Sequence, residues 1–139
     1  MERIGFIGIG LMGQRMGKRL LAAGYPLAVW NRSADKCAEL LSLGATLAAD
    51  IGALLAQADI VMLCVSDTAA VEQVVFGSAG VAAHGRSDQL LVDFSSIEPA
   101  ATRDFAARLQ RQCGMHWVDA PVSGGVGGAE SGKLVIMAG

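Results

Sequence analysis

A glycine-spaced turn near the N-terminus constrains the fold more than any other feature. The segment Gly8-Ile9-Gly10-Leu11-Met12-Gly13 directly follows a short apolar run and opens a stretch of helical period. Since glycine makes up 18 of the 139 residues, the spacing alone is a weak signal, and its place between strand and helix gives it weight. The first glycine permits a tight turn, the second lets the backbone approach a phosphate, and the third lets helix and strand pack closely. The turn predicts the pyrophosphate site of a dinucleotide, with a turn that binds no ligand as the alternative.

Short apolar runs alternate with segments of helical period along the rest of the chain. The predicted strands are residues 4–7, 27–30, 60–65, 90–94, 115–118 and 134–138. The predicted helices are residues 12–23, 34–43, 51–57, 69–75 and 99–112. Three of them are followed by a glycine suited to a left-handed cap: Gly24, Gly44 and Gly114.

The strands are apolar on both faces, as residues 60–65 illustrate, which is typical of a parallel sheet covered by helices on both sides. We therefore expect an α/β fold of the Rossmann type, with a doubly wound, mostly parallel sheet, in one domain of residues 1–139. Pro99 is predicted to be a first helical residue, with Ser95 and Ser96 as the cap region before it.

The residues after the second predicted strand bear on the choice of cofactor. Asn31-Arg32-Ser33 stand where an NAD-specific domain usually carries an acid that binds the ribose 2′-hydroxyl. Asn31 removes the repulsion of a 2′-phosphate, Arg32 can pair with that phosphate, and Ser33 can donate a hydroxyl hydrogen bond. The sequence thus favours NADP(H) over NAD(H). The alternative is that Ser33 caps the next helix while Arg32 is solvated.

Three later segments also carry polar groups toward the expected crevice. Val65-Ser66-Asp67 and Asp93-Phe94-Ser95-Ser96 follow later strands, although residue type alone favours helix capping for their Ser and Asp side chains. Ser123-Gly124-Gly125 offer a hydroxyl and accessible backbone amides that could bind a small carboxylate. A flexible loop without a ligand is the alternative there.

Composition and charge exclude several classes of protein. The 11 basic and 13 acidic residues are scattered and give a net charge of −2, so no basic stripe for nucleic acid is expected. Charged residues or glycines interrupt every apolar stretch before the roughly 20 residues that a membrane span needs. Cys37, Cys64 and Cys113 are too few and too widely spaced for a disulfide framework or a metal knuckle. We expect reduced cysteines and a cytoplasmic protein with no metal.

Several motifs taken together resemble the β-hydroxyacid dehydrogenase family, which includes 3-hydroxyisobutyrate dehydrogenase, tartronate semialdehyde reductase and glyoxylate/succinic semialdehyde reductases. The motifs extend over essentially the whole chain and are the following: Gly5-Phe6-Ile7-Gly8-Ile9-Gly10-Leu11-Met12-Gly13, Val29-Trp30-Asn31-Arg32-Ser33, Asp93-Phe94-Ser95-Ser96-Ile97 and Asp119-Ala120-Pro121-Val122-Ser123-Gly124-Gly125. The resemblance implies an N-terminal NAD(P)-binding domain of the 6-phosphogluconate dehydrogenase type.

The resemblance also implies roles for individual residues. Gly8 to Gly13 would hold the pyrophosphate, and Asn31 and Arg32 mark the NADP-preferring branch. Ser96 would contact the nicotinamide half, whereas Val65 and Ser66 are expected to line the cofactor crevice because they follow a strand. Ser123, Gly124 and Gly125 would hold the carboxylate of a small hydroxy acid or aldehyde acid, while Asp93 and Asp119 would be structural.

The chain departs from the family at its C-terminal end. The family's catalytic lysine and its helical catalytic and dimerisation domain lie beyond Gly139, and Lys133 does not match that lysine. We therefore expect this chain alone to have little or no turnover and no catalytic residue of its own. We also expect self-association through surface that the second domain would cover. The alternatives are a non-catalytic NADP-binding sensor or assembly module, and a relative such as an imine reductase.

Overall fold

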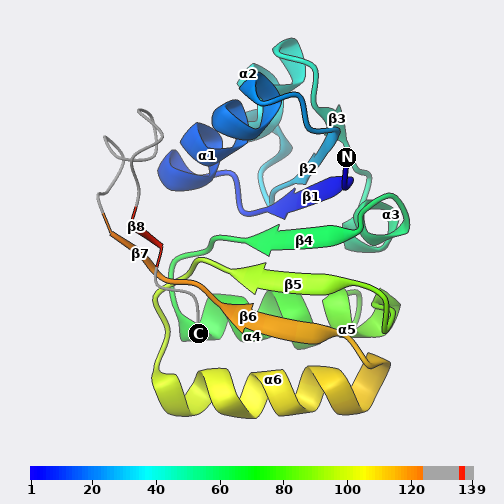
Figure 1. The fold of residues 1–139 in the computed structure, drawn as a ribbon, viewed down its shortest axis with the longest axis vertical. Helices are drawn as coiled ribbons and strands as arrows, with labels where there is room; N and C mark the ends of the chain where they lie inside the picture. Colours follow the sequence, from blue (N-terminus) through cyan, green and yellow to red (C-terminus); the bar gives the residue numbers. More distant parts are fainter. Residues whose placement is uncertain (124–134, 137–139) are drawn as a thin grey trace.

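The computed structural model describes residues 1–123 and 135–136, and it is built on a six-stranded parallel sheet (Figure 1). The strands lie in the order β3-β2-β1-β4-β5-β6, with every neighbouring pair parallel. Their bounds are β1 (Ile4–Ile7), β2 (Leu27–Trp30), β3 (Thr46–Leu47), β4 (Ile60–Leu63), β5 (Leu90–Asp93) and β6 (His116–Asp119). The order reverses between β1 and β4, so the fold is doubly wound as predicted.

Helices cover both faces of the sheet. They are α1 (Leu11–Ala22), the 3₁₀ helix η1 (Ala34–Cys37), α2 (Ala38–Ser42), α3 (Ile51–Ala56), α4 (Thr68–Phe76), α5 (Val81–His84) and α6 (Pro99–Cys113). One apolar cluster joins Leu63 of β4 to Leu54 of α3 and Leu109 of α6. The other joins Phe6 of β1 to Met16 of α1, together with side chains of α2. Since neighbouring strand residues alternate between the clusters, each cluster lies on its own face of the sheet.

The predicted helix ends are largely confirmed. Gly24, Gly44 and Gly114 all have positive φ, at 90°, 111° and 78°, as left-handed helix ends require. Pro99 is the first residue of α6, also as predicted. The predicted cap region is wrong, because the residue at the N-cap position of α6 is Glu98. Ser95 is buried and its hydroxyl is engaged with the loop after β4 instead.

Several short elements and one strand pairing differ from the prediction. The strand β3 and helix α5 are too short, at two and four residues, to give a periodic signal. The predicted helix of residues 34–43 is divided into η1 and α2. The predicted last strand is represented by β8 (Val135–Ile136), which pairs antiparallel with β7 (Val122–Ser123) in a separate two-stranded sheet. Within the described residues, no helix has the length and apolar character to cross a bilayer.

Candidate cofactor site

The three glycines of the turn after β1 meet three different surroundings. Gly8 has a φ of 97°, and a Cβ there would collide with the backbone carbonyl oxygen of Cys64. A Cβ at Gly13 would collide with the carbonyl oxygen of Gly8, so this glycine lets α1 pack against the turn. By contrast, apart from its chain neighbours, no described residue has an atom within 4 Å of a Cβ placed at Gly10. The turn is therefore closed at Gly8 and Gly13 and open at Gly10, where a phosphate could approach the backbone.

Helix α1 begins at this open position without a side-chain cap. Gly10 occupies the N-cap position, and the first turn of the helix contains no acidic residue. The amides of Leu11, Met12 and Gly13 belong to the first turn, where no carbonyl inside the helix can accept from them. Together with the positive end of the helix dipole, they form a site suited to an anion.

Asn31 links the glycine turn to the loop after β2. Its side-chain Oδ1 accepts a hydrogen bond from the backbone N–H of Ile9 at 2.9 Å, and its Nδ2 donates to the carbonyl oxygen of Ser33 at 3.0 Å. The backbone N–H of Gly8 also donates to the carbonyl oxygen of Trp30 at 3.1 Å. The Ile9 amide is already hydrogen-bonded to Asn31 and the Ile9 side chain is buried. Ile9 therefore stabilises the turn by packing and by this hydrogen bond.

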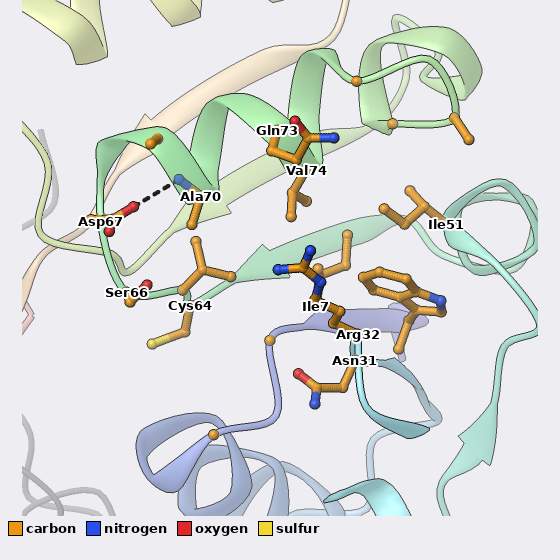
Figure 2. Close-up of a pocket in the computed structure, with 18 of the residues that line it drawn as sticks. Ile7, Asn31, Arg32, Ile51, Cys64, Ser66, Asp67, Ala70, Gln73 and Val74 are labelled. Atoms are coloured by element: carbon orange, nitrogen blue, oxygen red, sulfur yellow. Dashed lines mark hydrogen bonds between the residues drawn. The ribbon is translucent and has the colours of Figure 1, made fainter. Parts of the chain in front are cut away.

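A groove of about 1160 Å³ extends from the glycine turn between the loop after β2 and helix α4 (Figure 2). Of the residues predicted to bind a cofactor, six line this groove: Gly8, Gly10, Asn31, Arg32, Val65 and Ser66. The other six are not among its lining residues: Ile9, Leu11, Met12, Gly13, Ser33 and Ser96. The structure thus brings together three segments that are far apart in sequence, as expected for the carboxyl edge of a parallel sheet.

Arg32 extends from the end of β2 into this groove. Figure 2 shows its guanidinium in the space between Asn31 and the α4 residues Gln73 and Val74. Lys36 of η1 also lines the groove and adds a second cation to it. Ser33 is exposed, and its side chain makes no capping hydrogen bond. Sequence reasoning missed Lys36, although its place shortly after Asn31-Arg32-Ser33 was a usable signal.

Two acidic residues of the groove are helix caps. Oδ1 of Asp67 accepts from the backbone N–H of Ala70 at 2.8 Å and caps α4 (Figure 2). Oδ1 of Asp50 accepts from the N–H of Ala53 at 2.7 Å and caps α3. The capping interpretation of Asp67 is therefore confirmed, and neither carboxylate needs a ligand to explain it. Asp50 and Gln73 are further lining residues that sequence reasoning missed, since no motif contains them. Trp30 also lines the groove, and it lies within a motif of the resemblance but was assigned no role.

The carboxyl ends of β4, β5 and β6 carry titratable groups, of which Asp93 is buried and Cys64 and Asp119 are partly buried. Burial, and secondarily the charge of Asp93, raises the pKa of the Cys64 thiol to about 11, so this cysteine is protonated at neutral pH. Burial also raises the pKa of Asp93 to about 6, with the nearby charge of Asp119 adding to the effect and hydrogen bonding from Ser95 opposing it. Burial raises the pKa of Asp119 as well. None of these groups is poised as a nucleophile.

The predicted carboxylate site is only partly described. Ser123 belongs to β7 and pairs through its backbone with Val135, while Gly124 and Gly125 lie outside the described residues. The three cysteines are free. In residues 1–123 and 135–136, no group of three or more His, Cys, Asp or Glu side chains could hold a metal ion.

Comparison with known proteins gives consistent results. Residues 3–139 match the family model described as the NAD binding domain of 6-phosphogluconate dehydrogenase. The 2-hydroxy-3-oxopropionate reductase of Escherichia coli (strain K12) is 40% identical over 137 residues, which cover 99% of this chain and 46% of that protein. The mitochondrial 3-hydroxyisobutyrate dehydrogenase of Mus musculus is 35% identical over 136 residues, covering 98% of this chain and 40% of that protein.

A solved structure of Psf3 in complex with NADP+ and 2-OPP has a TM-score of 0.93 and 37% sequence identity, covering 97% of this chain and 48% of that chain. The chain therefore spans less than half the length of each of these relatives.

Proposed function

Because the chain belongs to the β-hydroxyacid dehydrogenase family, with an NAD-binding domain of the 6-phosphogluconate dehydrogenase type, we propose that it binds NADP(H) for an oxidoreductase acting on a small 3-hydroxy acid or aldehyde acid. The observation that carries this proposal is the contrast within the glycine turn. Gly8 and Gly13 are enclosed, whereas the Cβ position of Gly10 is open beside the groove. That arrangement fits a pyrophosphate held by backbone amides.

The preference for NADP(H) rests on the charges at the end of β2. Asn31 brings no negative charge to this position, and Arg32 and Lys36 both line the groove. A guanidinium binds a phosphate through two parallel hydrogen bonds, and an ammonium adds a point charge. Since Asn31 already bonds to Ile9 and Ser33, its part is to be uncharged and to hold the loop in place. Arg32 is proposed to contact the 2′-phosphate, with Lys36 beside it.

The chemistry of the bound cofactor would be hydride transfer between the nicotinamide and the carbon bearing the hydroxyl or carbonyl group. The chain's own contribution is to hold and orient the cofactor at the carboxyl edge of the sheet. Ser96, Ser123, Gly124 and Gly125 are proposed to approach the nicotinamide and the substrate carboxylate, as the family resemblance implies. The proton is proposed to move through a lysine outside these 139 residues, so that the chain alone would turn over little substrate. A cytoplasmic location and self-association stay predictions.

Calorimetric titration of the purified chain with NADPH and with NADH tests the proposal. We expect NADPH to bind at least 10-fold more tightly, a difference of about 1.4 kcal/mol. In Arg32→Ala this preference should fall because the 2′-phosphate loses its guanidinium partner, while NADH binding should stay nearly unchanged. Arg103→Ala removes an exposed arginine from α6 and serves as the matched control. Equal binding of the two cofactors by the unmodified chain would disprove the NADP preference, and binding of neither would disprove the site.

A further inference from the structure

Two buried polar residues connect the loops that follow β4 and β5. Asp93 is 0% exposed and Ser95 is 2% exposed. Oδ1 of Asp93 accepts a hydrogen bond from the backbone N–H of Ser95 at 2.9 Å. The hydroxyl oxygen of Ser95 in turn accepts from the backbone N–H of Val65 at 2.9 Å. The Asp93 carboxylate thus fixes Ser95, and Ser95 fixes the backbone of the neighbouring loop.

The link reaches residues that belong to the groove but does not itself line it. Val65 and Ser66 are lining residues, whereas Asp93 and Ser95 are not. Ser96, which is exposed, follows Ser95 directly. Among the residues that the structure describes, the only other side-chain hydrogen bond between these segments is a longer one, in which the N–H of Glu98 donates to the Thr68 hydroxyl at 3.4 Å. Ser95 therefore makes the shorter of the two side-chain hydrogen bonds that connect them.

The topology indicates which half of a dinucleotide these loops would face. The glycine turn follows β1, whose neighbours are β2 on one side and β4 on the other. In a doubly wound sheet a dinucleotide lies across this reversal point, with its two halves on opposite sides. The proposed contact between Arg32 and the 2′-phosphate places the adenosine half beside β2. The nicotinamide half would then lie beside the loops after β4 and β5.

We propose that Asp93 and Ser95 are positioning residues that set the nicotinamide end of the site without touching the cofactor. This inference rests on the proposed function. Without the Ser95 hydroxyl the Val65 N–H would lose its acceptor, and the loop that carries Val65 and Ser66 would be free to shift. A misplacement of about 1 Å at such a position is enough to weaken binding or reaction strongly.

The state of Asp93 supports a role beyond packing. Its second oxygen, Oδ2, is buried and has no hydrogen-bond partner among the described residues. Asp119 lies opposite Asp93 in the sheet register, and its carboxylate adds to the effect of burial in raising the pKa of Asp93. A buried acid under these conditions lowers the stability of the fold, which is more typical of a functional site than of a packing position.

Binding of two ligands to Ser95→Ala separates positioning from general structure. NADPH has a nicotinamide half, whereas 2′,5′-ADP carries only the adenosine half with its 2′-phosphate. We expect Ser95→Ala to bind NADPH at least 10-fold more weakly and 2′,5′-ADP within twofold of the unmodified chain. Ser95→Thr retains a hydroxyl and should restore much of the NADPH affinity. Ser42→Ala, which removes an exposed hydroxyl bonded to the Glu39 carbonyl, is the matched control and should change neither affinity.

An equal loss for both ligands, or no loss for either, would overturn the inference. An unmodified chain that binds neither ligand would instead contradict the proposed function. If Ser95→Ala does not fold, NMR of the unmodified chain tests which half of the cofactor affects this segment. Amide signals of Ser95 and Ser96 should move on addition of NADPH but not of 2′,5′-ADP, and identical responses to the two ligands would overturn the inference.

Discussion

The loop that follows β2 presents exposed charged side chains to the groove, whereas the loops that follow β4 and β5 are held by buried polar atoms. On the β2 side, Arg32 and Lys36 are exposed and line the groove. On the other side, Asp93 and Ser95 are buried, and the Ser95 hydroxyl accepts a hydrogen bond from Val65, which lines the groove. Exposed groups can be changed with little effect on the fold, whereas buried polar groups contribute to folding and to function together. We therefore expect cofactor choice and cofactor alignment to be separable properties of this domain.

Gly13→Ala should disturb both the β2 side and the β4–β5 side of the groove, and it should have the largest effect on stability and binding. The new methyl group would collide with the carbonyl oxygen of Gly8, and backbone cannot yield as a flexible side chain does. We expect a loss of about 3 kcal/mol or more in unfolding free energy, with cofactor binding abolished. Urea denaturation and NADPH titration measure the two effects. A variant as stable as the unmodified chain would show that the close packing of α1 on the turn is not required.

Asp93→Asn should alter only the β4–β5 side of the groove, and its effect on the free energy of unfolding should depend on pH. Since burial raises the pKa of Asp93 from 3.8 to about 6, the folded state favours the neutral acid. The contribution of Asp93 to the free energy of unfolding is therefore highest below about pH 4, where its carboxyl is neutral. It falls as the pH rises through about 6, where the carboxyl of the folded state becomes charged. At about 1.4 kcal/mol per pKa unit, the buried charge costs on the order of 3 kcal/mol at neutral pH.

Urea denaturation of Asp93→Asn and the unmodified chain from pH 4 to pH 7.5 measures this cost. Relative to the unmodified chain, the variant should gain stability as the pH rises. Asp104→Asn alters a carboxylate whose side chain is 60% exposed, and it should show no comparable gain. A difference between Asp93→Asn and the unmodified chain that does not vary with pH would contradict the buried-charge account.

Gly10→Ala should impair binding on both sides while sparing the fold. Within the described part of the chain, only the neighbouring residues in sequence approach the added methyl group within 4 Å, so the unfolding free energy should change little beyond the small effect of the backbone. The methyl would occupy the space proposed for the pyrophosphate, and we expect a 10- to 100-fold loss of affinity, about 1.4–2.8 kcal/mol. Titration with both NADPH and NADH should show equal losses. Unchanged affinity would place the pyrophosphate elsewhere.

Lys36→Ala should alter only the β2 side and have the smallest effect. Its ammonium is exposed, so solvent screens its attraction to a 2′-phosphate. We expect a loss of roughly 3-fold in NADPH affinity, about 0.6 kcal/mol, with NADH affinity unchanged. Repeating the titration at high salt should shrink the difference. A loss of equal size for NADH would mean that Lys36 acts on the loop rather than on the phosphate.

Much of the fold could be predicted from the sequence, because the strands of a covered parallel sheet are continuous apolar runs. The strand Ile4–Ile7 and the strand Leu27–Trp30 were predicted to the residue. The elements that escaped prediction, β3, β7 and α5, are too short for periodicity and form because neighbouring elements pack against them. The independent pairing of β7 with β8 also depends on tertiary context.

The residues of the candidate site likewise divide into those that the sequence predicts and those that only the structure reveals. The turn Gly8 to Gly13 and Arg32 carry signals in their residue types and in their place after a strand. Ser95 carries no such signal, because a serine after a strand is typical of a helix cap. Only the three-dimensional structure shows that its hydroxyl accepts a hydrogen bond from the Val65 N–H. Asn31 is intermediate: its position was predicted, but its hydrogen bond to the Ile9 amide depends on the three-dimensional arrangement.

A crystal structure of the chain with NADP+ would show directly where the two phosphate groups bind. We expect the pyrophosphate to lie over Gly10 within hydrogen-bond reach of the first-turn amides of α1. We also expect the 2′-phosphate to lie within about 3 Å of the Arg32 guanidinium. A pyrophosphate bound away from Gly10, or an Arg32 guanidinium without contact to the 2′-phosphate, would contradict the proposed cofactor site.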